Sequence, residues 1–548
     1  MTTELIAKTF QGLEPLLAQE LTELGASDIQ IGRRMVTFTG DKEMLYRANF
    51  CLRTAIRVLK PIKHFKAKSA DDVYSAVKAI DWTQYLTTDT TFAVDSVVFS
   101  PEFHHSKFVA YKVKDAIADQ FREQTGKRPN VSVSNPDIQL HIHISDYDAT
   151  LALDASGESL HRRGYRQETV AAPLNEVLAA AIIMMTGWRG ETDFLDPFCG
   201  SGTLCIEAAL IARGIAPGVF RNSYAFEKWP DFDRELFERI YNDDSQEREF
   251  SHHIYGRDND PKAVGIALRN VRAAGLAKDI TIEEADFTKC KLATKPTSLA
   301  DFVAAIERED QDEAADTAPS APALIVTNPP YGERISTPDL LGLYKTIGQK
   351  LKREHAGGEA WILSYREECF EEIGLKPSLK TPLYNGSLEC ELRKYVLFDG
   401  KLNDHRAAGG AVKTDDERRQ MAEKRRFKQH RNDFRRSFDD DDDRRSFGQP
   451  RDRRSFDRGG ERRFRGDRDG DDNHRFNKCS RRDGDHRDHR RDGESRSDGF
   501  SSRHGFGKGS GRKGFGGRDD YRSKGNDRAA RQEARRRFFG GHDGGRED

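Results

Sequence analysis

The sequence lacks long apolar runs and paired cysteines. No run of about 18 apolar residues occurs in the 548 residues, which argues against a membrane-spanning helix. The first 25 residues are amphipathic and acidic rather than basic and then apolar, unlike an export signal. The seven cysteines are scattered, without a C-x-x-C pair, which favours reduced thiols over a disulfide framework or a zinc site. We therefore expect a cytoplasmic protein without membrane contact.

Large aliphatic residues are almost absent from the last part of the chain. Residues 411–548 contain no Leu, Ile or Trp and one Val, Val412, so this segment cannot bury a core. It carries 41 Lys and Arg against 30 Asp and Glu, a net charge of +11, whereas residues 1–410 carry −12. Arg-Arg-Ser-Phe recurs in this segment and is followed by stretches built on Gly, Phe and Arg, a composition typical of disorder. We predict a disordered Arg/Asp/Gly/Phe-rich tail at 404–548 that binds RNA weakly; a solubilising or self-associating tail is the alternative.

Two regions with different secondary-structure patterns precede this tail. Up to about residue 160, short β-rich runs alternate with helical patterns at 12–24, 71–80 and 107–123, which predicts a small α+β module. From about residue 169, apolar strands alternate with helices, which predicts a parallel, doubly wound sheet covered on both faces. Ligands should bind beyond the carboxyl ends of its strands. These strands are expected near 193–195, 253–255, 281–283, 324–327, 359–363 and 394–398.

The first chemical motif runs D-P-F-C-G-S-G-T from Asp196 to Thr203. A predicted strand ends at Asp196, and Gly200 and Gly202 allow the backbone to approach a ligand before a helix begins. The dinucleotide fingerprint needs a further glycine where Cys205 stands, and there is no Walker lysine. Taken alone, this motif is weak evidence, because tight strand-to-helix turns recur in many α/β folds.

The second motif is Asn328-Pro329-Pro330-Tyr331, directly after an apolar strand. The two prolines fix the backbone and remove two donors, which leaves carbonyl acceptors beside the Asn328 amide. The Asn328 side-chain oxygen and the Pro329 carbonyl can accept both N–H bonds of an exocyclic amino group, while Tyr331 stacks on the ring that carries it. By itself the motif could also be a rigid turn beside a capping Asn.

Together the two motifs resemble those of class I S-adenosylmethionine-dependent methyltransferases that act on amino nitrogens. The rest of the chain resembles the THUMP-domain RNA methyltransferases, in particular the L half of the bifunctional large-subunit rRNA methyltransferases, an N2-guanine enzyme. The K-type half of those enzymes is absent, and the charged tail follows instead. The supporting segments are 12–25, 106–117, 160–166, 172–176, 225–229 and 383–390.

The resemblance implies a fold and a domain order. A Rossmann-like α/β methyltransferase domain at 165–402 is expected to follow an α+β region, made of a ferredoxin-like subdomain at 1–60 and a THUMP RNA-binding domain at 61–158.

The resemblance also implies roles for residues of the cofactor pocket. Asp258 would bind the ribose hydroxyls, and Asp286 with Phe287 would bind the adenine. Asp258 and Asp286 could otherwise be turn or helix-cap residues. No metal is expected, because the histidine pairs have no cysteine or carboxylate cluster beside them. The expected cofactor-binding set is Asp196, Phe198, Gly200, Gly202, Thr203, Asp258, Asp286, Phe287 and Asn328, and the expected catalytic set is Asn328, Pro329, Pro330 and Tyr331.

A basic face for RNA phosphates is expected in the amino-terminal module. The alternative is an ordinary solvated helix face. The residues are Lys107, Lys112 and Lys114 on one predicted helix, with Arg162, Arg163 and Arg166 soon after it.

The sequence thus predicts transfer of a methyl group from S-adenosylmethionine to the N2 amino group of a guanine in large-subunit (23S) rRNA. N2-guanine methylation of tRNA is the closest alternative, because THUMP domains serve both substrates. Methylation of DNA adenine or of a protein glutamine fits the amino-terminal half less well. A non-catalytic, RNA-binding ribosome-assembly factor is the alternative from another functional class, and the intact Asn328–Tyr331 motif argues against it.

Overall fold

The computed structural model describes residues 2–292, 322–332, 339–398, 400 and 418. The tail predicted at 404–548 lies outside the described residues, apart from Arg418. No helix in the described part of the chain is long and apolar enough to cross a membrane.

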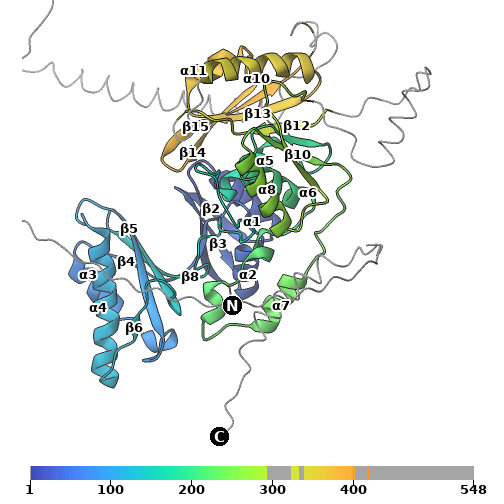
Figure 1. The fold of residues 1–548 in the computed structure, drawn as a ribbon. Coiled ribbons are helices and arrows are strands. Elements are labelled where there is room, and N and C mark those ends of the chain that lie inside the picture. Colours follow the sequence, from blue (N-terminus) through green and yellow to red (C-terminus); the bar gives the residue numbers. More distant parts are fainter. Residues whose placement is uncertain (1, 293–321, 333–338, 399, 401–417, 419–548) are drawn as a thin grey trace, which may run out of the picture. The chain divides into compact units, whose positions relative to one another are not determined.

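The amino-terminal module is built on one eight-stranded sheet (Figure 1). All neighbouring strands pair antiparallel except β5, which runs parallel to β6 and β7. In spatial order the strands are β2 (Ser27–Gly32), β3 (Met35–Gly40), β1 (Thr3–Lys8), β4 (Arg57–Lys66), β8 (Asp148–Asp154), β7 (Ile138–Ser145), β5 (Thr91–Phe99) and β6 (Asn130–Val131). The helices are α1 (Glu14–Glu23), α2 (Lys42–Cys51), α3 (Ala70–Lys78), the short 3-10 helix η1 (Trp82–Gln84) and α4 (Ser106–Thr125).

Strand β4 joins the two halves of this sheet. Its first residues pair with β1 up to Leu59, and from Leu59 to Lys66 it pairs with β8. A register shift between Pro61 and Lys63 follows directly after the last β1 pair, where proline has no N–H to donate to a ladder. The domain boundary expected between residues 60 and 61 therefore falls inside a continuous strand.

The carboxy-terminal half contains a seven-stranded sheet (Figure 1). Its strand order places β9 between β10 and β12, so that the chain changes direction across the sheet beside β9. In spatial order the strands are β11 (Ile280–Glu284), β10 (Ile254–Asp258), β9 (Phe194–Asp196), β12 (Leu324–Thr327), β13 (Glu359–Ser364), β15 (Leu388–Val396) and β14 (Leu379–Asn385). The helices are α5 (Glu176–Thr186), α6 (Thr203–Ala212), α7 (Arg234–Asn242), α8 (Pro261–Ala273), α10 (Leu340–Glu354) and α11 (Glu367–Ile373), with 3-10 helices η2 (Pro217–Phe220) and η3 (Ala225–Lys228).

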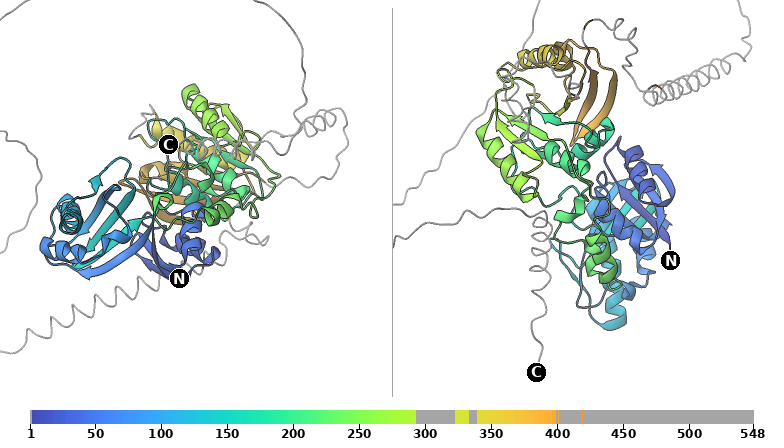
Figure 2. Two further views of the ribbon diagram at one scale, coloured as in Figure 1. Left: turned by 90° about the horizontal axis from the view of Figure 1, so that it is seen from below. Right: turned by 90° about the vertical axis from the view of Figure 1, so that its right-hand side faces the viewer.

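Successive apolar residues of the central strands point to opposite faces of this sheet. Phe194 and Val326 belong to the core beneath α5, α6 and α8, whereas Leu195 and Ile325 belong to the core beneath α10 and α11. Figures 1 and 2 show the two helical layers on the two sides of the sheet. Burial on both faces explains why these strands are continuous apolar runs, and the doubly wound arrangement expected from the sequence is confirmed.

The expectation of an entirely parallel sheet is wrong at one edge. Strands β9 to β13 are parallel, but β15 runs antiparallel to β13, and β14 pairs antiparallel with β15. Strand β15 also begins at Leu388, before the expected start at residue 394. The reason is the turn at Asn385-Gly386, with Gly386 at φ 67°. Strands joined by so short a turn can only be antiparallel, and Asn-Gly is a strong hairpin signal.

The segment between α6 and β10 packs onto the amino-terminal module. Phe226 stacks on Tyr46 of α2 with ring centres 4.4 Å apart, and the Tyr46 hydroxyl accepts a hydrogen bond of 3.0 Å from the Asp233 amide. Phe226 and Phe237 share one buried cluster with the side chains of the eight-stranded sheet. The segment between α6 and β10 therefore connects the carboxy-terminal half to the eight-stranded sheet through apolar contacts.

A buried charged cluster lies at the same junction. Arg163 is 2% exposed and donates to the carbonyl oxygens of Leu160 (2.9 Å) and Arg53 (2.5 Å), with its Nε 3.5 Å from a Glu207 carboxylate oxygen. The same Glu207 oxygen accepts a 2.9 Å hydrogen bond from the Tyr165 hydroxyl. Because its guanidinium is enclosed by protein, Arg163 cannot contact RNA phosphates, and its expected RNA-binding role is wrong.

We predict a large loss of stability when Arg163 is replaced and almost none when the adjacent Arg162 is replaced. Arg163→Ala should destabilise the fold by about 3 to 5 kcal/mol, because the buried Glu207 would lose the cation that forms an ion pair with it. Arg162 is exposed and pairs with the exposed Glu158, 2.7 Å away, so Arg162→Ala should change stability by less than about 0.5 kcal/mol. Urea unfolding of both variants measures the difference. Equal, small effects would show that the buried cluster does not stabilise the junction.

Candidate functional site

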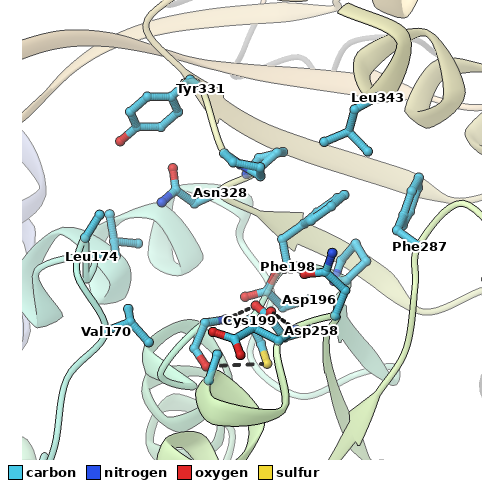
Figure 3. Close-up of a pocket in the computed structure, with 18 of the residues that line it drawn as sticks. Val170, Leu174, Asp196, Phe198, Cys199, Asp258, Phe287, Asn328, Tyr331 and Leu343 are labelled. Carbon is cyan, nitrogen blue, oxygen red and sulfur yellow. Dashed lines mark hydrogen bonds between the residues drawn. The ribbon is translucent and has the colours of Figure 1, made fainter. Parts of the chain in front are cut away.

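A cavity of about 810 Å³ opens at the carboxyl ends of β9, β10, β11 and β12. Each of these strands is followed by residues that line it, which is the geometry expected where a doubly wound sheet changes direction. The opposite walls come from residues 170–174, the start of α10 and the β14–β15 turn. Figure 3 shows Asp196, Asp258 and Phe198 in this cavity, with Asn328 between them and Tyr331. The volume suits a ligand of drug or cofactor size.

The loop after β9 is fixed by hydrogen bonds to β10. The Cys199 amide donates to the Arg257 carbonyl (2.8 Å), and the Gly200 amide donates to a carboxylate oxygen of Asp258 (2.9 Å). Gly200 lies at φ 52° and Gly202 at φ 80°, a region that suits glycine. Gly202 does not line the cavity. It precedes α6, where an added Cβ would lie 3.3 Å from the Cβ of Ala267.

Asp196 is the most buried of the aspartates that line the cavity. It is 1% exposed, and its Oδ1 accepts hydrogen bonds from the Thr327 hydroxyl (2.7 Å) and the Phe198 amide (3.1 Å). Burial raises the pKa of Asp196 from 3.8 to about 7, against the opposing effect of these two hydrogen bonds. The nearby Asp258 carboxylate raises this pKa further. Asp196 thus links the ends of β9 and β12 and titrates near neutral pH.

Asp258, which ends β10, keeps acceptor capacity for a ligand. One carboxylate oxygen accepts from the Gly200 amide (2.9 Å) and the other from the Asp260 amide (3.0 Å). A carboxylate offers about four lone-pair sites, so each oxygen can accept another donor from the cavity. The arrangement suits a pair of neighbouring hydroxyl groups.

Asp286 and Phe287 follow β11 and have different surroundings. Oδ1 of Asp286 accepts from the amide (2.9 Å) and hydroxyl (2.6 Å) of Thr288, and Oδ2 lies 2.9 Å from the Lys289 ammonium. The hydrogen bonds from Thr288 and then Lys289 lower the pKa of Asp286 to about 2. Phe287 is buried against Phe198, with ring centres 4.9 Å apart. This end of the cavity therefore offers two aromatic rings, and less free acceptor capacity on Asp286 than on Asp258.

Asn328 carries an unpartnered polar atom. Its Oδ1 is buried and accepts no hydrogen bond from any described residue, and the residue lines the cavity after β12. A buried acceptor without a partner costs roughly 1 to 3 kcal/mol, so such atoms in native proteins often mark a site that a ligand completes. Pro329, Pro330 and Tyr331 line the same wall.

Sequence reasoning missed the residues that hold Tyr331. The Tyr331 hydroxyl accepts a 2.9 Å hydrogen bond from the side-chain amide of Asn385, at the end of β14. The Tyr331 ring also packs edge-on against Tyr365, with ring centres 5.2 Å apart. Leu388 lines the cavity from the next strand. Asn385 and Leu388 lie within residues 383–390, a segment that resembles the family but has no chemical motif of its own.

Arg166 stabilises the cavity wall and is not available to bind an RNA phosphate. It donates to Glu176 (2.8 Å), to the Leu174 carbonyl (2.9 Å) and to the Thr203 hydroxyl (2.9 Å). Its expected RNA-binding role is therefore wrong, because its donors are directed inward. Thr203 lines the cavity, but its hydroxyl accepts this bond.

The buried amide of Asn270 supports the same wall from α8. Its Oδ1 accepts from the Gln167 amide (2.9 Å), and its Nδ2 donates to the Ser201 carbonyl (3.0 Å). Arg166 and Asn270 together connect residues 167–174 to the loop after β9.

The other expected RNA-binding residues lie at the surface. Lys107 is exposed, Lys112 pairs with Asp71 (3.1 Å) and Lys114 with Asp115 (2.7 Å). Their contact with RNA stays a prediction, as does that of Arg162. Within the described ranges, no group of three or more His, Cys, Asp or Glu residues could hold a metal ion.

Family models match nearly all of the first 394 residues. A model described as "RlmL ferredoxin-like domain" matches residues 4–59, a "THUMP domain" model matches residues 67–154, and a model described as "RMKL-like, methyltransferase domain" matches residues 163–305 and 300–394.

Curated relatives and a solved structure resemble the same part of the chain. The ribosomal RNA large subunit methyltransferase K/L of Syntrophotalea carbinolica is 40% identical over 72% of this chain and 53% of its own length, so the chain spans about half of that relative. A provisionally named RNA methyltransferase of Synechocystis sp. is 37% identical over 72% of this chain and 97% of its own. The crystal structure of a provisionally named methyltransferase complexed with SAH is 29% identical, with a TM-score of 0.62, and covers 73% of this chain and 99% of its own.

The raised pKa of Asp196 predicts a pH-dependent stability. Because the folded protein binds this proton more tightly than the unfolded chain, the stabilisation is complete below about pH 4 and is lost as the pH rises through about 7. Relative to Asp196→Asn, which does not titrate, the wild type should lose about 4 kcal/mol across this window. Unfolding of the ligand-free proteins at several pH values measures this. A constant difference between the two would rule out titration of Asp196.

Proposed function

The chain belongs to the RMKL-like methyltransferases that carry a THUMP domain, and we propose that it methylates the exocyclic N2 of a guanine in large-subunit rRNA. Its methyl donor is S-adenosylmethionine. A cytoplasmic location, where ribosomal RNA is found, is part of this proposal.

The cavity fits this cofactor. In our proposal, Asp258 accepts hydrogen bonds from the two ribose hydroxyls, and Phe287, with Phe198 beside it, contacts the adenine, with Asp286 near its amino group. The backbone of the loop at Gly200 and the buried carboxyl of Asp196 surround the methionine end. The size of the cavity and the free acceptor capacity of Asp258 support these roles. Gly202 and Thr203 act indirectly, by starting α6 and fixing the loop.

The unpartnered Oδ1 of Asn328 is the observation that carries the proposed chemistry. The cofactor supplies a methyl group already activated as a sulfonium, so the enzyme needs to align the acceptor rather than activate the donor. Asn328 Oδ1 and the Pro329 carbonyl accept the two N–H bonds of the amino group and direct the nitrogen lone pair toward the methyl group. Pro330 fixes the turn, and Tyr331, held by Asn385 and Tyr365, stacks on the base. The transfer would break the bond between sulfur and the methyl group, leave the cofactor as a neutral thioether, and pass one proton of the amino group to solvent.

The choice of substrate rests on separate arguments. The Asn328 site suits any exocyclic amino group on a planar base, and the resemblance to N2-guanine enzymes favours guanine. A relative named as a ribosomal RNA large subunit methyltransferase is 40% identical, and the THUMP match favours RNA over DNA or protein. Nucleoside mass analysis of rRNA and tRNA from cells without the protein tests the choice: loss of N2-methylguanosine from tRNA alone would reject rRNA as the substrate.

Asp258→Ala should weaken binding of S-adenosylmethionine by roughly 1.5 to 3 kcal/mol, the range for hydrogen bonds to a charged group. Titration calorimetry on the purified variant measures the change. Because Asp258 is directed at the cofactor, methyl transfer at saturating cofactor should be reduced much less. An unchanged affinity would exclude the carboxylate from the ribose role.

Asn328→Ala should have the opposite pattern. Cofactor affinity should stay within a few tenths of a kcal/mol, while single-turnover methyl transfer to an rRNA fragment falls ~100-fold or more, because the amino group loses its orienting acceptor. Each variant is therefore the control for the other. If Asn328→Ala transferred methyl groups at nearly the wild-type rate, the motif would be a structural turn only.

A further inference from the structure

Asn385 brings a second side-chain amide to the cavity wall that carries Asn328 and Tyr331. It is the last residue of β14, and the β14–β15 turn that follows it also lines the cavity. Leu383, two residues earlier and therefore on the same face of the strand, is fully buried in the core beneath α5 and α6. This buried neighbour anchors the strand end that directs the half-buried Asn385 side chain to the cavity wall.

One hydrogen bond sets the orientation of the Asn385 amide. Its Nδ2 donates to the Tyr331 hydroxyl at 2.9 Å, and no described residue donates a hydrogen bond to its Oδ1. A side-chain amide has its donors on the nitrogen and its acceptor sites on the oxygen, so the acceptor end remains available. Tyr331 also packs against Tyr365. The Asn385 amide is therefore bonded to a ring that is itself held in place.

The same part of the wall carries the unpartnered oxygen of Asn328. In Figure 3, the Tyr331 hydroxyl and the Asn328 amide point into the same part of the cavity. Because Asn385 is hydrogen-bonded to that hydroxyl, its amide oxygen belongs to this part of the cavity as well. The wall thus presents two side-chain acceptors, Oδ1 of Asn328 and Oδ1 of Asn385, to a planar base.

Two neighbouring acceptors match one edge of guanine. In guanine, the 2-amino group lies next to the ring N1–H, so that two donors are side by side on the edge by which unpaired bases are read. In adenine and cytosine, the ring nitrogen next to the amino group is an acceptor, and its lone pair would face the second amide oxygen. Leaving two buried acceptors opposed is costly. Asn328 alone accepts any exocyclic amino group, whereas the pair of acceptors favours guanine.

We propose that Asn385 selects guanine: its Oδ1 accepts a hydrogen bond from guanine N1–H while Asn328 holds the 2-amino group. The inference rests on the proposed function and deepens it, because it names the residue that distinguishes guanine from adenine and cytosine. The hydrogen bond to Tyr331 keeps the Asn385 nitrogen turned away from the base. Asn385 is then a specificity-determining residue that contacts the substrate.

The test compares two bases at one position of the RNA. One substrate is an rRNA fragment in which the wild type forms N2-methylguanosine at a mapped position. The other has 2-aminopurine at that position, which keeps the 2-amino group but has an acceptor at N1. Single-turnover methyl transfer to both is measured at saturating S-adenosylmethionine. The ratio of the two rates is compared between proteins, because the missing oxygen of 2-aminopurine affects them all alike.

The variants of the full chain are Asn385→Ala, Asn385→Asp and the control Ser387→Ala. Ser387 is exposed in the same turn and lies outside the cavity wall. Unchanged affinity for S-adenosylmethionine shows that each variant is folded.

The wild type should methylate guanine faster than 2-aminopurine, and Asn385→Ala should reduce this ratio by about 10-fold or more, because the acceptor opposite N1 is gone. Asn385→Asp keeps an oxygen at this place and should retain the preference for guanine, with the Tyr331 hydroxyl then acting as donor. Ser387→Ala should leave both rates unchanged.

The proposal is wrong if Asn385→Ala slows transfer to both bases by the same factor, since Asn385 would then only hold Tyr331. It is also wrong if the ratio falls as far in Asn385→Asp as in Asn385→Ala, because an acceptor at this position would not select guanine. Both results leave the proposed methyl transfer intact. That proposal fails separately if the wild type forms no N2-methylguanosine in rRNA.

Discussion

Parallel strands present all their carboxyl ends at one edge of a sheet, and the site depends on this constraint. Asp196, Asp258 and Asn328 are far apart in the sequence, yet β9 lies between β10 and β12, so the three residues line one cavity. The hydrogen bond from Thr327 to Asp196 connects strand ends 131 residues apart. The loop after β9 is then fixed by Asp258 and Arg166. A shift of either neighbouring strand would separate the cofactor side of the cavity from the Asn328 wall.

Within this cavity, chemical roles follow from which polar atoms remain without protein partners. The Asp286 carboxylate is largely satisfied by Thr288 and Lys289, whereas Asp258 retains acceptor capacity, and Asn328 Oδ1 has no partner among the described residues. Unsatisfied buried groups cost stability, and the fold retains one where the proposed target amino group would bind. By contrast, Tyr331 is held from two sides by Asn385 and Tyr365. A rigid ring beside an unpaired acceptor is a preorganised site for a planar base.

Charge alone is a poor guide to the RNA contacts of this protein. Arg162, Arg163 and Arg166 look equivalent in the sequence. In the structure, Arg163 and Arg166 point into the protein, where they join the amino-terminal module and the cavity wall to the seven-stranded sheet, whereas Arg162 is exposed. The surface lysines of α4 are mostly paired with acids. The two halves of the chain are further joined by the packing of Phe226 on Tyr46.

The sequence by itself determined the class of the fold and the two motifs, because both depend on local patterns. Apolar runs buried on two faces identify parallel strands, and Asn328-Pro329-Pro330-Tyr331 is recognised from four consecutive residues. Only the tertiary structure decided which side chains are buried and which strands are neighbours. The direction of β15, the continuity of β4 across residues 60 and 61, and the inward orientation of Arg163 and Arg166 all depend on contacts between distant segments. Exposure of Phe108 and Tyr111 does too, since a helical pattern does not show what covers each face.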